Sequence, residues 1–367
     1  MKGQKMRNED EETLERVSSE EEDAESSPAS FEVITYPADY TLEGIVAKYR
    51  KGSIFIPGFE RKFVWTINQA SRLIESFLLG LPVPAIFLYL EPETNKFVMI
   101  DGQQRLLSIY YFMEGYFGEP NRGNRAEFQL KGLNKSSPFY EKKYENLKES
   151  NEAAFNKLND SVLRAFIVKQ IDPEGSSSVF HIFERLNTGG TPLVGQEIRN
   201  CIYHGEFKEL LAELNNNKGW REIFGKQEPD KRQRDVELIL RFFALYCNSQ
   251  KYGKPMKDFL SNFMSDNRHG RIISIEDARR LFDDTVSLIR GTLGPRPFHF
   301  KSGLNAAAFD CVSIAFAKNR HSIPHDLKDR FSKLKAEGSF LKSIEDGTTD
   351  EVVVARRIML SENKLFG

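Results

Sequence analysis

Phe97-Val-Met-Ile-Asp-Gly-Gln-Gln-Arg-Leu-Leu107 joins a short apolar run to a segment with helical spacing, and the change falls on Asp101-Gly102. A helix start exposes backbone N–H groups that lack intrahelical partners, and it carries a partial positive charge. Gly102 would let a ligand approach the backbone closely, and Arg105 adds a forked donor suited to phosphate or carboxylate. The junction therefore predicts an anion-binding site between a strand and a helix.

The same junction also has a purely structural interpretation. Asp-Gly after a strand is common turn chemistry, and Asp101 could simply cap the helix. Gln103 and Gln104 weaken that interpretation, because glutamine favours neither a turn nor a cap and apolar residues would pack better. At the junction alone, both interpretations stay open.

The composition of the chain is that of an ordinary globular protein. Its 367 residues are 40% hydrophobic and 29% charged, and this length is enough for two or three domains. No run of 18 apolar residues occurs, and the N-terminus lacks the apolar segment of a signal peptide. Cys201, Cys247 and Cys311 are odd in number and lack metal-type spacing, which argues against disulfide scaffolds and zinc modules. We therefore expect a cytoplasmic protein.

The near-zero net charge hides an asymmetry along the chain. Residues 1–30 hold ten acidic and four basic side chains, whereas residues 31–367 carry a balance of +5. The first segment is rich in Glu and Ser and is predicted to be a disordered acidic leader. The balance of the remainder is only mildly basic, which argues against tight nonspecific DNA binding.

The spacing of the apolar residues changes near residue 176, from a mixture of strand and helix periods to an almost entirely helical period. Before it, the pattern predicts helices at 41–51, 67–79 and 103–114 and strands at 54–56, 85–91, 96–100 and 163–171, with a polar insertion near 121–160. After it, the period is helical almost throughout. The predicted fold class is α+β, with a small α/β domain at 31–175 followed by a mainly α-helical region at 176–367.

A second segment with possible site chemistry is Ile56-Pro-Gly-Phe-Glu-Arg-Lys-Phe-Val-Trp65, which places a turn, two cations and three aromatic residues before a helix. Arg61 could reach an anion. Phe63 and Trp65 are expected to pack inward, as aromatic residues beside a strand end usually do.

Three later segments could also carry chemistry. In Phe183-Glu-Arg-Leu-Asn-Thr-Gly-Gly-Thr-Pro-Leu193, a helix is expected to end at Asn187, and Gly189-Gly190 could form either a backbone nest for an anion or a plain turn. Lys231-Arg-Gln-Arg234 places cations at a helix start, which hints at a partner, although a solvated loop is the favoured interpretation. Phe298-His-Phe-Lys301 is expected to be a packed loop rather than a nucleic-acid contact.

Taken together, the motifs resemble one family. The matching segments are, in order, Ile56-Pro-Gly-Phe-Glu-Arg…Trp65, Leu73-Ile-Glu-Ser…Gly80-Leu-Pro-Val-Pro, Ile100-Asp-Gly-Gln-Gln-Arg105 and Phe183-Glu-Arg-Leu-Asn-Thr-Gly-Gly190. Their order and content resemble the N-terminal domain of GmrSD-type restriction endonucleases, which has a ParB/sulfiredoxin-like fold. The resemblance covers residues 40–300.

This resemblance implies binding or hydrolysis of a nucleoside triphosphate, with Mg²⁺, in restriction-type defence against phage and other foreign DNA. Carried over to matching positions, the implied catalytic residues are Asp101, Gln104 and Arg105, and the implied nucleotide-binding residues are Gly102, Gln103, Arg61 and Asn187. No protein ligand set for a metal is implied.

The chain departs from the family pattern in two respects. Position 60 is Glu where the family usually has Gln, so a carboxylate would stand near the anion site. His321-Ser-Ile-Pro-His325 lacks the rest of a His-Asn-His nuclease pattern, so any DNA cleavage could fall to a separate nuclease partner. The P-loop pattern Gly-x4-Gly-Lys-Ser/Thr is also absent, so the expected phosphate site is of another kind.

Two alternatives to a hydrolase remain open. One is a non-catalytic sensor module that binds a nucleotide or DNA, and the other is a ParB-like DNA nickase. Both rest on analogy of fold.

Overall fold

The computed structural model of the chain describes residues 32–56, 63–91, 94–118, 126–172, 178–186, 194–301 and 303–367. Two compact units are present and are described separately. Ser30–Glu174 with His181–Leu193 form an α/β unit, and Gly175–Phe180 with Val194–Gly367 belong to a helical unit. The α+β class predicted from the sequence is confirmed. The predicted acidic leader lies outside the described residues.

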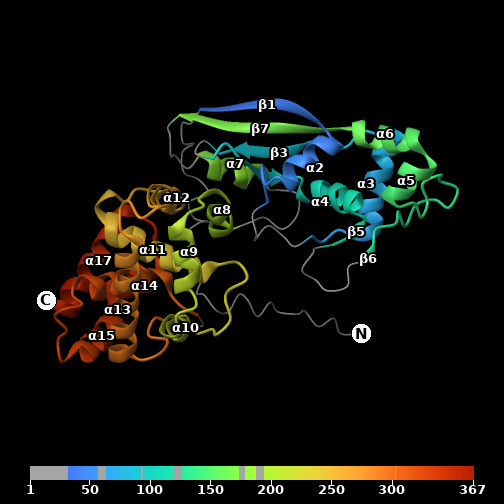
Figure 1. Cartoon of the computed structure of the whole chain (residues 1–367). Coiled ribbons are helices and arrows are strands. Elements are labelled where there is room, and N and C mark those ends of the chain that lie inside the picture. The colour runs from blue at the N-terminus through green and yellow to red at the C-terminus, as the bar shows by residue number, and fades with distance from the viewer. Residues whose placement is uncertain are drawn as a thin grey trace. The chain divides into compact units, whose positions relative to one another are not determined.

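A mixed five-stranded sheet forms the centre of the α/β unit. Its strand order is β1 (Glu32–Thr41), β7 (Val162–Asp172), β3 (Ile86–Leu90), β4 (Phe97–Asp101) and β2 (Ile54–Phe55). The pairs β1–β7 and β3–β4 are antiparallel, whereas β3–β7 and β2–β4 are parallel. β1, β7 and β3 run side by side in Figure 1. The long strand β1 has no counterpart among the strands predicted from the sequence.

Local capping explains where the helices next to the sheet begin and end. α2 (Leu42–Arg50), which lies within the helix predicted at 41–51, starts at Thr41, whose hydroxyl accepts a hydrogen bond from the Gly44 amide. α3 (Ile67–Leu79) starts with a capping box made by Thr66 and Gln69. It ends at Gly80, which adopts the left-handed conformation that glycine allows.

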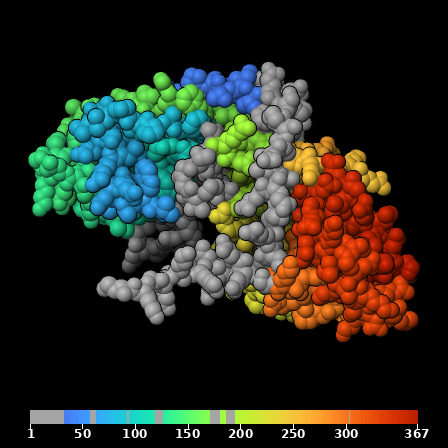
Figure 2. Space-filling model, turned by 180° about the vertical axis from the view of Figure 1, so that it is seen from behind, coloured from blue at the N-terminus to red at the C-terminus, as the bar shows by residue number. Residues whose placement is uncertain are grey.

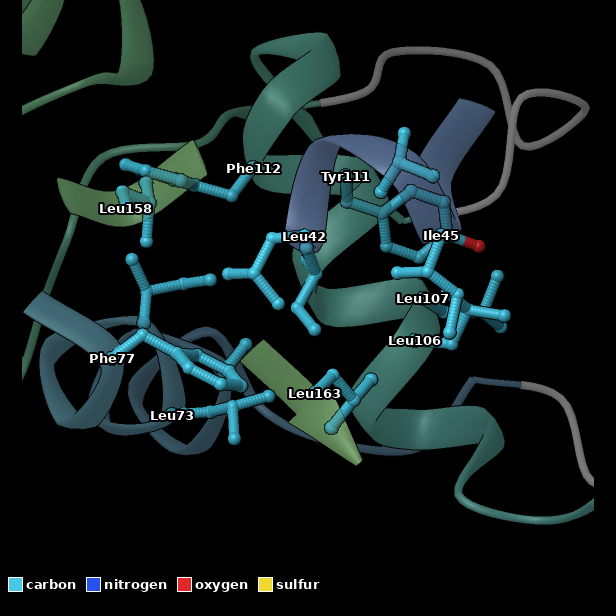
Figure 3. Close-up of a cluster of buried hydrophobic side chains, with 14 of the residues drawn as sticks. Leu42, Ile45, Leu73, Phe77, Leu106, Leu107, Tyr111, Phe112, Leu158 and Leu163 are labelled. Carbon is cyan, nitrogen blue, oxygen red and sulfur yellow. The ribbon is translucent and has the colours of Figure 1, made fainter. Parts of the chain in front are cut away.

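One face of the sheet is covered by the helices that build the core of the α/β unit. Figure 3 shows this core, with labelled side chains from α2, α3, α4 (Gln103–Glu114), α6 (Glu152–Asp160) and β7. The labelled residues are Leu42, Ile45, Leu73, Phe77, Leu106, Leu107, Tyr111, Phe112, Leu158 and Leu163. All of these side chains are buried, so helices far apart in sequence share one apolar interior.

The described residues of the region predicted as a polar insertion near 121–160 contribute buried side chains to this core. Its described residues include the short strand β6 (Ala126–Glu127), which pairs with β5 (Tyr116–Phe117), and α5 (Tyr144–Ser150) and α6. Phe128, Leu130 and Leu158 are fully buried. The apolar residues here are few and are spread over short helices, whose stability depends on tertiary contacts.

The helical unit is built around α14. Its helices are α8 (Gly195–Ile202), α9 (Glu206–Leu214), α10 (Lys218–Phe224), α11 (Arg234–Asn248), η2 (Ser249–Lys251), α12 (Met256–Asp266), α13 (Ile275–Leu293), α14 (Ala306–Lys318), α15 (Leu327–Ala336), α16 (Gly338–Glu345) and α17 (Glu351–Phe366). α14 is buried from Ala306 to Ala317. Figure 2 shows α17 in red on the surface of this unit. Within the described residues, no helix is long and apolar enough to cross a membrane.

Candidate functional site

The sheet topology gathers three motif segments at one end of the sheet. β3 and β4 are antiparallel, with Phe87 opposite Asp101, so the residues before β3 and after β4 emerge at the same end. β2 is parallel to β4, so the chain also leaves β2 at this end. The described parts of three segments that carry the family resemblance are therefore neighbours because of strand direction, although they are far apart in the sequence.

Gly102 forms the turn from β4 into α4. Its φ is +105°, a left-handed conformation that residues with a Cβ rarely adopt. A Cβ on Gly102 would also lie 2.3 Å from Cγ2 of Ile86 on the neighbouring strand. Both the backbone conformation and the close packing therefore require glycine at this position.

The start of α4 is not capped by Asp101. Gly102 is the N-cap residue, and among the described residues no side chain caps this helix start. The Leu106 amide donates the first helical hydrogen bond, to the Gly102 carbonyl at 3.0 Å. The interpretation in which Asp101 serves as a simple cap is therefore wrong. The first turn carries the partial positive charge of a helix start.

Asp101 instead pairs with Arg105, one turn further along α4. Arg105 Nη2 donates to Asp101 Oδ2 at 2.7 Å and to the Ala85 carbonyl at 3.2 Å. The Arg105 side chain is 16% exposed and that of Asp101 is 49% exposed. Arg105 Nε is buried and makes no hydrogen bond within the described part of the chain. The guanidinium is thus held in a fixed orientation at the helix start.

Gln104 uses its side-chain oxygen to hold the segment that leads into α3. Its Oε1 accepts hydrogen bonds from the backbone amides of Val64 at 3.0 Å and Trp65 at 3.2 Å. Phe63 packs edge-on against Tyr111, with ring centroids 5.0 Å apart. Phe63 and Trp65 pack against the core, as predicted. The amides of Val64 and Trp65 were not singled out from the sequence, although both residues lie inside a quoted motif.

Two of the predicted site residues cannot be placed. Arg61 and Asn187 lie outside the described residues, as does Glu60. Asp101, Gly102 and Gln103 follow one another at the helix start together with Gln104 and Arg105. The structure therefore brings five of the seven predicted residues together, and they are consecutive in the sequence.

The two arginines of the basic cluster at the start of α11 form ion pairs within the helical unit. Arg234 forms an ion pair with Asp230 at 2.7 Å, and Arg232 lies 3.8 Å from Glu197. Burial of Asp230 favours a raised pKa, but the hydrogen bonds and charge of Arg234 outweigh this and lower the pKa of Asp230. Arg232 and Arg234 therefore have acidic partners within the helical unit.

The loop that contains Phe298 is packed, as the sequence predicted. Phe298 is fully buried and packs edge-on against Phe309 of α14. In the described ranges of the chain, no group of three or more His, Cys, Asp or Glu side chains could hold a metal ion. The candidate site at the start of α4 is therefore the arrangement with the most evident chemistry.

Comparison with known proteins identifies the part of the chain that contains this site. Residues 42–204 match the family model described as GmrSD restriction endonuclease, N-terminal domain. These residues belong to that family. No curated protein matches the chain. The GmrSD N-terminal domain is a domain of restriction-type defence against foreign DNA, and the described site residues lie within its matched range.

Proposed function

We propose that the GmrSD N-terminal domain of this protein binds the phosphates of a nucleoside triphosphate at the start of α4 and hydrolyses the nucleotide. The observation that carries the proposal is the helix start at Gly102 with the Arg105 guanidinium held beside it. A helix N-terminus and an oriented guanidinium are complementary to phosphate in charge and in hydrogen-bond geometry. Nucleotide turnover would then serve defence against foreign DNA.

Arg105 is suited to bind phosphate without losing its present contacts. Both of its hydrogen bonds, to Asp101 and to Ala85, use Nη2. Within the described residues Nη1 makes no such contact, so it can donate to a phosphate oxygen. Because Asp101 already orients the guanidinium, little side-chain entropy is lost when a ligand binds.

A magnesium ion fits this site if nucleotide phosphates supply most of its ligands. Mg²⁺ is usually held by one or two carboxylates together with phosphate oxygens and waters. Asp101 is half exposed, and its Oδ1 makes no hydrogen bond to another described residue, so this oxygen can reach a metal. When bound, Mg²⁺ would neutralise charge on the phosphates. Asp101 would also orient an attacking water.

Gln103 and Gln104 would contact phosphate oxygens or water. Gln103 stands at the first position of α4, where its amide can position a phosphate oxygen. The oxygen of Gln104 is engaged by two backbone amides, so its Nε2 is the atom left to contact phosphate or water. This engagement favours binding over hydrolysis, and it supports a nucleotide sensor as the second candidate function.

Titration of the purified protein with each common nucleoside triphosphate and Mg²⁺ tests the proposal, with binding and phosphate release measured together. Arg105→Ala is expected to weaken binding by about ten- to a hundredfold, the range for loss of a hydrogen bond to a charged group. Asp101→Ala should abolish phosphate release. The control is Arg330→Ala, which removes a similar i,i+4 ion pair, with Asp326, from the helical unit.

Each outcome of this experiment has a defined meaning. Binding and turnover that are lost in Arg105→Ala but kept in Arg330→Ala support the hydrolase. Binding without turnover in the wild type supports the sensor. If Arg105→Ala binds nucleotide as well as Arg330→Ala does, the phosphate site has been placed wrongly. The DNA-binding alternatives are tested by measuring DNA affinity at several salt concentrations. If the logarithm of the affinity does not change with the logarithm of the salt concentration, these alternatives are excluded.

A further inference from the structure

Val64 is an exposed apolar residue whose backbone is hydrogen-bonded to Gln104 of the candidate phosphate site. Val64 is 60% exposed. Its backbone amide, like that of Trp65, donates to Oε1 of Gln104 in the first turn of α4. Phe63, the preceding residue, is fixed by edge-on packing against Tyr111. The Val64 side chain is therefore exposed to solvent, while its backbone is hydrogen-bonded to the first turn of α4.

Isolated exposed apolar residues are normal on protein surfaces and need no explanation by themselves. Val352 on the outer surface of α17 is such a residue, and it is 62% exposed. Val64 differs because the side chain that holds its backbone belongs to the motif that forms the phosphate site. Val64 is a candidate ligand contact because its backbone is bonded to Gln104 at the start of α4, and not because of its exposure alone.

Arg105, like Gln104, forms a side-chain hydrogen bond to the backbone of another segment, the one before β3. Its guanidinium donates to the Ala85 carbonyl, and the preceding residue, Pro84, is exposed. Gln104 and Arg105 thus each hold a short stretch of backbone next to an exposed apolar residue. The anion site is accompanied by apolar surface, which a phosphate group cannot use.

We propose that Val64 contacts the nucleoside part of the ligand, so that the site takes a nucleotide and not free phosphate or a DNA backbone. This inference rests on the proposed phosphate site at the start of α4. The phosphates would lie at the helix start and Arg105, and the base or sugar would cover the Val64 side chain. The side-chain oxygen of Gln104 holds the backbone of Val64 in place, in addition to the contact proposed for its Nε2.

The test compares inorganic triphosphate with each of the four common ribonucleoside triphosphates, all with Mg²⁺, by calorimetric titration. Wild-type protein is expected to bind at least one nucleotide about tenfold or more tightly than triphosphate. Val64→Ser should weaken nucleotide binding by about three- to tenfold, since it removes most of the apolar burial at one side chain. Triphosphate binding should be unchanged in this variant.

Two control variants separate this proposal from the phosphate site itself. Val352→Ser, a matched exposed valine in the helical unit, should leave both affinities unchanged. Arg105→Ala should weaken nucleotide and triphosphate alike, and if it weakens neither, the phosphate site is wrong. If Arg105→Ala acts as expected but Val64→Ser binds nucleotide like the wild type, only the Val64 contact is refuted. Equal wild-type affinity for triphosphate and all nucleotides would refute it too.

Discussion

At the scale of single residues, the candidate site depends on Gly102, which is the point where strand geometry ends and helix geometry begins. The residue combines a left-handed backbone with direct packing against Ile86, so it fixes the distance between β3 and the start of α4. Asp101 and Arg105 can meet one helical turn apart only because this turn is tight. The site geometry is therefore set by a residue without a side chain.

Gly102→Ala is expected to destabilise the protein by about 2–4 kcal/mol, because backbone strain and overpacking against Ile86 add together. The control is Gly115→Ala at the other end of α4. Gly115 has φ +80°, but a Cβ there would have no atom within 4 Å, so only the strain of about 1–2 kcal/mol is expected. Urea unfolding measures both values, and equal losses would contradict the clash with Ile86.

At the scale of elements, a buried ion pair joins α11 to α14. Arg241 Nη2 donates to Asp310 Oδ2 at 2.5 Å, and both side chains are almost completely buried. Burial alone would lower the pKa of Arg241, but the charge and hydrogen bonds of Asp310 raise the pKa above its ordinary value. The two helices are thus tied by charges that would each be costly alone in the interior.

Asp310→Ala is expected to destabilise the helical unit by about 3–5 kcal/mol, because it removes the carboxylate that forms the buried ion pair with Arg241. The double variant Arg241→Met, Asp310→Leu removes both charges and should lose much less stability than the single variant. Denaturant unfolding of the three proteins measures this. A double variant as unstable as Asp310→Ala would show that apolar repacking fails at this interface.

At the scale of the whole molecule, the two compact units have separate cores. The core of the α/β unit draws its buried residues from positions 42–167. That of the helical unit includes Trp220, whose ring packs against Phe282 and Phe309. Units with their own cores often unfold as separate cooperative transitions.

We therefore expect two transitions in differential scanning calorimetry of the full chain. Gly102→Ala should lower the temperature of one transition, and Asp310→Ala should lower that of the other, because the two residues belong to different cores. A single transition that both variants lower equally would mean that the units unfold together.

Much of the local structure could be predicted from the sequence because its signals act over a few residues. Thr41 caps α2, Gly80 ends α3, and α4 spans Gln103–Glu114 as the pattern indicates. The GmrSD resemblance is confirmed over residues 42–204 for the same reason, since motif identity and order are properties of the sequence. The long strand β1 escaped prediction, because it is an edge strand with weak apolar alternation whose partner, β7, follows 120 residues later.

The sequence by itself therefore determined the α+β class, most helices and the motif from Asp101 to Arg105. Only the tertiary structure decided what those side chains do: Asp101 orients Arg105 instead of capping α4, and Gln104 holds Val64 and Trp65. The physical reason is how far apart in the sequence the interacting residues lie. Caps and periodicity depend on neighbouring residues, whereas these contacts depend on strand directions that bring separate segments to one end of the sheet.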